Sequence, residues 1–204
     1  SMYSAALPAM LLSRQNGGET AVGLVNTFTG LATLAGSILV SLRAAPKSRV
    51  RVICNSLLFS MSTENFLLAF GRSTPMWCIA AALGWIFIPV MNANMNALFR
   101  FYIPIEMQGR VYSARNTLQF FTIPVGYLLG GVLVDRVFEP FMMTLPLGSM
   151  LIRLLGAGKG SGAALLFLIL GVLGVLVCLV FRCDSHIWAL EQAGDSESSA
   201  QICE

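Results

Sequence analysis

Charge is scarce in this chain of 204 residues, in which charged side chains make up 11% and hydrophobic side chains 56%. Soluble domains carry roughly 25% charged residues, so an ordinary water-exposed globular domain is excluded. A single histidine is present, and half of the acidic residues lie in segment 183–204. The clustered titratable groups of an enzyme and the ligand spacing of a metal site are therefore missing. We expect neither an enzyme nor a bound metal or cofactor.

The net charge of +3 is small and dispersed among the segments between apolar runs, which argues against nucleic-acid binding. The start of the chain lacks the basic region and the small-residue cleavage site of a signal peptide. We expect residues 1–13 to be the end of a truncated helix. The acidic, serine-containing residues 183–204 are expected to form a disordered tail.

Long apolar runs dominate what is present, and five of them are long enough to cross a bilayer. A helix needs about 20 apolar residues for this, and only helices satisfy their own backbone hydrogen bonds in lipid. The fold class expected is therefore an all-α membrane protein, a polytopic helical bundle over residues 14–182. The expected spans are residues 21–42, 52–70, 75–99, 117–138 and 163–181.

Basic residues are concentrated in alternate loops. Loop 43–51 holds four basic residues and no acidic one, and loop 100–115 holds three with a single acid. The positive-inside rule predicts that both loops are cytoplasmic, and five crossings then place the C-terminus there too. The residues expected to anchor this face to anionic lipid or to gate it are Arg43, Lys47, Arg49, Arg51 and Arg110.

Hydroxyl groups recur at helical spacing in the first full span, where Thr29 and Thr33 share a face with Asn26, Ser37 and Ser41. Two interpretations are open. Such residues permit close helix–helix contact, or they form the wall of a hydrated pathway.

Amides gather in the third full span, where Asn92 and Asn96 share a face and Asn94 points roughly opposite. Pro89 permits a kink one turn earlier. Gln119 continues this polar character in the next span. The alternatives are a kinked, tightly packed helix pair and a substrate-lining pair.

Glu64 is the one carboxylate placed well within a span. Intramembrane carboxylates are costly and often mark ion or proton paths, which makes Glu64 a candidate for proton coupling. It could instead reach the headgroup region or pair with a basic side chain.

Gly126 and Gly130 fit the small-xxx-small pattern of helix contacts. The loop 156–161 lacks the spacing of a nucleotide-binding P-loop.

The segment Pro104-Ile-Glu-Met-Gln-Gly-Arg-Val-Tyr-Ser113, with the Phe138-Glu139-Pro140 turn and the glycines of 158–162, resembles the major facilitator superfamily. The similarity is to the C-terminal half of transporters in the macrolide-efflux-like branch of drug exporters. It implies that the full spans are helices eight to twelve and that residues 1–13 end helix seven. It also implies a matching six-helix N-terminal half.

The resemblance implies efflux of an amphipathic small molecule or drug by alternating access, with protons as the candidate coupling ion. The residues expected to line the substrate path are Asn92, Asn96, Gln119, Thr29 and Thr33. The alternative function is a non-transporting membrane scaffold or sensor.

Overall fold

The computed structural model describes residues 2–14, 16–42, 46, 48–146, 149–156 and 158–183, and the regular structure in these residues is entirely helical. Five helical stretches are long and apolar enough to cross a membrane, which confirms the expected class. Three are uninterrupted helices and two are composite. They are α2 (Glu19–Leu42), α3 (Arg49–Phe70), α4 (Thr74–Trp85) with α5 (Ile88–Tyr102), α6 (Ile105–Val132) with η1 (Leu133–Phe138) and α7 (Glu139–Thr144), and α9 (Ser161–Cys183).

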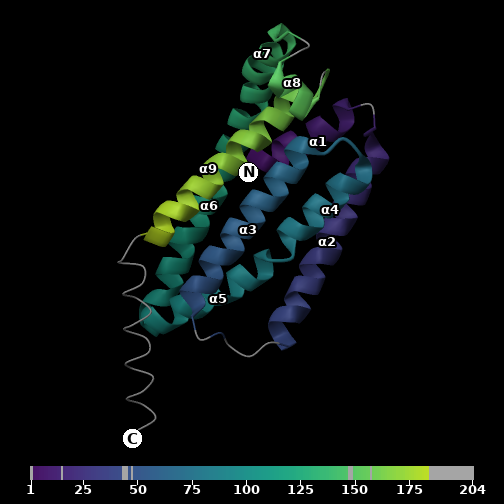
Figure 1. Ribbon diagram of the computed structural model, residues 1–204. Coiled ribbons are helices and arrows are strands. Elements are labelled where there is room, and N and C mark those ends of the chain that lie inside the picture. The colour runs from purple at the N-terminus through teal and green to yellow at the C-terminus, as the bar shows by residue number, and fades with distance from the viewer. Residues whose placement is uncertain are drawn as a thin grey trace, which may run out of the picture.

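The bundle is built around α3, which lies between α9 and α4, while α2 packs on the other side of α4 (Figure 1). Small residues make these approaches close, among them Ala80 and Ala81 on α4 and Ala164 on α9, which are fully buried. Trp77 and Phe167 supply the largest buried side chains. The short α1 (Met2–Ser13) and α8 (Met150–Leu155) cover the end of the bundle at which α9 begins.

The third span is broken near its middle, as the proline had indicated. Regular hydrogen bonding ends with the Ile86 N–H donating to Ala82 and resumes with the Met91 N–H donating to Phe87. Pro89 lies in the first turn of α5, where its missing N–H costs nothing. Gly36 of α2 packs against this break so closely that a Cβ there would collide with the Ile86 carbonyl oxygen.

The fourth span begins earlier than the sequence predicted. Residues 105–115, expected to belong to a loop, are the first turns of α6, and the continuous stretch Ile105–Thr144 has 40 residues. At 1.5 Å per residue it is about 60 Å long, twice the hydrocarbon thickness. The stretch 116–134 is uncharged. The expectation was therefore wrong about secondary structure, because helix continues beyond the apolar region.

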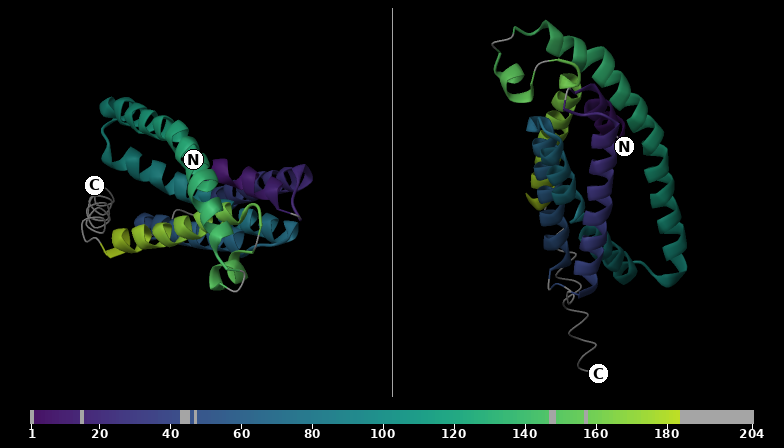
Figure 2. Two further views of the ribbon diagram at one scale, coloured as in Figure 1. Left: turned by 90° about the horizontal axis from the view of Figure 1, so that it is seen from above. Right: turned by 90° about the vertical axis from the view of Figure 1, so that its right-hand side faces the viewer.

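Helix α6 runs along one side of the bundle and contacts α1 in its second half (Figure 2). Gly126 and Gly130 are the buried residues of this helix. A Cβ on Gly130 would lie 3.3 Å from the Cα of Met2, so the expected small-residue contact is confirmed. Residues 116–125 of α6 are exposed.

Candidate functional site

The hydroxyl groups of α2 are satisfied within their own helix. Thr29, Thr33 and Ser37 each donate to the carbonyl oxygen four residues earlier, at 2.8 Å. The residues with which α2 packs, Val25 and Gly36 among them, lie about a quarter turn away around the helix. Thr29 and Thr33 are half-buried at the border of that contact. The hydroxyls therefore form a polar flank and make no cross-helix hydrogen bond within the described residues.

The amide side chains of α5 are not arranged as expected from the sequence. Asn96 accepts a hydrogen bond of 3.3 Å from Arg115 of α6, and the Arg115 guanidinium lies 5.4 Å from the ring centre of Phe99. Asn92 is half-buried, and Gln119 is exposed on α6. The structure thus brings Asn96 to α6 through Arg115, but it does not bring Gln119 to the amides of α5.

A cavity of about 530 Å³ lies between α2, α3 and the broken span. Its size falls in the usual range for small-molecule sites. Ile86 and Phe87 of the break form part of its wall, together with aliphatic side chains of α2 and α3. Asn94 and Ser56 are the buried polar side chains in the lining, and Arg49 lies at the start of α3. The site is therefore apolar, with a few polar groups of different chemistry.

Sequence reasoning missed Asn94 and Ser56 as lining residues. Asn94 is 9% exposed and its amide nitrogen donates to the Val90 carbonyl oxygen at 2.8 Å, which leaves the amide oxygen as an acceptor. The available signal was its position opposite Asn92 and Asn96. Which of two opposite helix faces turns inward depends on neighbouring helices, and periodicity alone does not reveal it.

Glu64 lies inside the bundle. It is 8% exposed, and its Oε1 accepts a hydrogen bond of 2.9 Å from the indole N–H of Trp85. Gly84 leaves the space for this carboxylate, because a Cβ on Gly84 would overlap it. One turn earlier on α3, the Ser60 hydroxyl donates to the Gly84 carbonyl oxygen at 2.8 Å. The end of α4 is thus fastened to α3 next to the break.

The surroundings of Glu64 bear on one of the alternatives from the sequence. The carboxylate accepts its hydrogen bond from the indole of Trp85 on the next helix, and no basic side chain pairs with it among the described residues. Tyr3 of α1 lies close enough to Glu64 to interact with it, and the Tyr3 hydroxyl is buried. Three helices therefore meet at this carboxylate.

Of the basic residues predicted to anchor one face, Arg49, Arg51 and Arg110 lie at the end of the bundle where α3 and α6 begin (Figure 1). Arg49 is half-buried beside the cavity, while Arg51 and Arg110 are exposed. Arg43 and Lys47 fall outside the described residues, as does segment 184–204.

Comparisons of the chain with protein-family models, with curated proteins and with solved structures each found no match.

Proposed function

We propose that this chain forms one helical half of a secondary transporter that moves amphipathic small molecules across the membrane. The observation that carries the proposal is the amphipathic cavity built on a helix broken near the middle of its span. Transporters place substrate sites at discontinuous helices near the bilayer midplane, where a break frees backbone groups and allows movement. The proposed direction is efflux, as expected from the sequence resemblance.

The cavity lining matches an amphipathic cargo. The aliphatic walls and Phe87 accept an apolar body, while the Asn94 amide oxygen and the Ser56 hydroxyl offer hydrogen bonds. Arg49 adds a positive charge at the end of the cavity near the start of α3. A molecule with an apolar skeleton and a polar or anionic group satisfies both parts of this lining.

A second helical bundle completes the proposed pathway. The polar flank of α2 and the exposed residues 116–125 of α6, Gln119 among them, are the surfaces offered to it. Rocking of one bundle against the other would expose the site alternately to each side. Glu64 stays the candidate for proton coupling, since its partner Trp85 is the last residue of α4 before the break.

Uptake of a fluorescent amphipathic dye into inverted vesicles containing the full-length protein tests the proposal. Asn94→Ala removes a polar lining group, and Ala97→Leu reduces the cavity volume without removing one. We expect each to lower energy-dependent uptake by about tenfold, the effect of losing one good interaction of about 1.4 kcal/mol.

Asn55→Ala is the matched control, because this exposed amide on α3 lies outside the cavity lining and outside the surfaces offered to the second bundle. Protein abundance in the vesicles is measured for every variant. Normal uptake by both cavity variants would reject the cavity as the site. Absence of uptake in the unmodified protein, with and without a proton gradient, would favour the scaffold or sensor alternative.

A further inference from the structure

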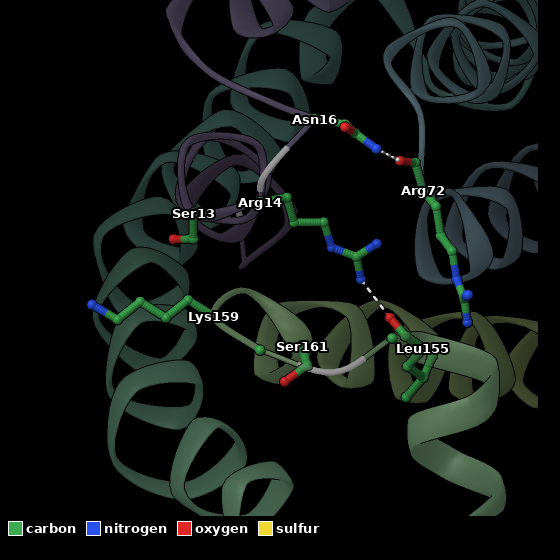
Figure 3. A pocket seen from close by; sticks show the side chains of 9 residues that line it. Ser13, Arg14, Asn16, Arg72, Leu155, Lys159 and Ser161 are labelled. Carbon is green, nitrogen blue, oxygen red and sulfur yellow. Dashed lines mark hydrogen bonds between the residues drawn. The ribbon is translucent and has the colours of Figure 1, made fainter. Parts of the chain in front are cut away.

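A second pocket of about 490 Å³ lies at the opposite end of the bundle from Arg49 and is lined by basic side chains (Figure 3). It is formed where the turn after α1, the turn between α3 and α4, and the loop before α9 meet. Each of these three segments contributes one basic residue, namely Arg14, Arg72 and Lys159. No acidic side chain is among the described residues that line it.

The two arginines are held by neutral oxygen atoms. Arg14 donates to the carbonyl oxygens of Gly71 at 2.6 Å and Leu155 at 2.7 Å. Arg72 donates to the Arg153 carbonyl oxygen at 2.5 Å. These bonds fix the positions of both guanidinium groups, as Figure 3 shows for Arg14, but they do not neutralise either charge.

Arg14 and Arg72 repel each other electrostatically. Burial, followed by the charge of Arg72, lowers the pKa of Arg14, and Glu139 acts in the opposite direction. Both carboxylate oxygens of Glu139 are engaged elsewhere, accepting from the N–H groups of Gly160 at 2.9 Å and Gly162 at 2.8 Å. The positive charge of the pocket is thus arranged without a protein carboxylate inside it.

We propose that this pocket binds an oxyanion of the phosphate type through the guanidinium groups of Arg14 and Arg72. Guanidinium groups suit phosphate because their planar N–H donors match its oxygen atoms. The lining residues Gly156 and Gly158 have positive φ angles and open space beside their Cα atoms, which leaves room for a ligand. Lys159 is exposed, and in Figure 3 its ammonium group points away from Arg14, so its role is secondary.

This pocket would hold phosphate differently from a P-loop. In a P-loop the backbone N–H groups surround the phosphate, whereas Glu139 already occupies two such groups at the start of α9. Side chains would therefore hold the anion. Its position at the helix ends allows two sources for the same chemistry, a phospholipid headgroup or free phosphate.

The test uses the full chain in nanodiscs, with two arms that separate these sources. One arm titrates inorganic phosphate into nanodiscs of phosphatidylcholine alone and measures binding by the shift in thermal unfolding. The other compares unfolding in phosphatidylcholine with that in discs containing about one third phosphatidylglycerol, an anionic lipid with one phosphodiester.

Arg72→Gln is the informative variant, because Arg72 is exposed and its replacement keeps the Arg14 bonds to Gly71 and Leu155. We expect Arg72→Gln to weaken binding by about tenfold in whichever arm shows binding. Lys159→Gln should weaken binding less. Arg136→Gln is the matched control, since Arg136 is an exposed arginine in η1 that does not line the pocket. The proposal is supported if the ligand stabilises the protein in either arm and Arg72→Gln reduces this stabilisation more than Arg136→Gln does. No stabilisation in both arms, or equal loss in the control, would overturn it.

Discussion

The hydrogen bond between Trp85 and Glu64 determines how a carboxylate is tolerated within the bundle. An unpaired buried carboxylate is costly, and a hydrogen bond to a charged group contributes about 1.5–3 kcal/mol. The indole N–H supplies that bond at 2.9 Å, and Gly84 supplies the space. The pair fixes α4 to α3.

Removing the indole donor should destabilise the bundle. We expect Trp85→Phe to lower the free energy of unfolding by about 1–3 kcal/mol, because Glu64 then loses its buried partner. Glu64→Gln should cost less, because an amide oxygen still accepts the bond. Thermal unfolding of Trp85→Phe, of Glu64→Leu and of the double variant Glu64→Leu/Trp85→Phe gives the coupling by a double-mutant cycle. Additive losses would show that the bond contributes nothing.

Glu139 stabilises the start of α9 by accepting two backbone N–H bonds that would otherwise be unpaired. We expect Glu139→Ala to lower the free energy of unfolding by about 2 kcal/mol, in the upper range for helix caps. Glu19→Ala is the control, since Glu19 is an exposed acid in the first turn of α2. Thermal unfolding in one detergent compares them, and equal losses would contradict a specific cap.

The sequence identifies Glu64 and Asn94 as unusual residues within apolar runs, but it does not reveal their contacts. A carboxylate in an apolar run is visible in the sequence, whereas its partner lies on another helix, 21 residues away. The orientation of Asn94 into the cavity likewise depends on where α2 and α3 pack. Periodicity shows which residues share a helix face, but it does not show which polar face points into the bundle.

At the scale of elements, the break between α4 and α5 shows what a proline predicts and what it does not. Pro89 predicted the kink, but nothing local predicted that Gly36 of another helix would pack against it. The beginning of α6 was missed for a related reason. Hydropathy marks the membrane-embedded part of a helix, and residues 105–115 continue the helix although three of their side chains are charged.

The close approach of α2 to the break gives a steric prediction. We expect Gly36→Ala to destabilise the bundle by about 1–3 kcal/mol, the cost of overpacking, because the new methyl group meets the Ile86 carbonyl oxygen. Gly30→Ala on the same helix meets open space, so it should be neutral or stabilising by up to about 1 kcal/mol. Thermal unfolding measures both. Similar effects at the two positions would contradict the contact.

At the scale of the whole molecule, the two ends of the bundle differ in charge and in structure. One end has the starts of α3 and α6 with exposed arginines and the cavity nearby. The other has short helices, the Glu139 cap and the basic pocket. The number of spans was predictable from apolar length, but these end structures depend on contacts between distant segments.

The arrangement of helices predicts which loops lie on the same side of the membrane. This can be tested separately from which of the two sides is cytoplasmic. Single cysteines at positions 51 and 110, introduced after replacing the five native cysteines, should react with an impermeant thiol reagent from the same side. Cysteines at positions 16 and 159 should react from the opposite side, because they lie at the other helix ends. The positive-inside rule further predicts that positions 51 and 110 are cytoplasmic. Labelling of 51 and 110 from different sides would refute the helix arrangement. Labelling of both from outside would leave the helix arrangement intact and reverse only its orientation in the membrane.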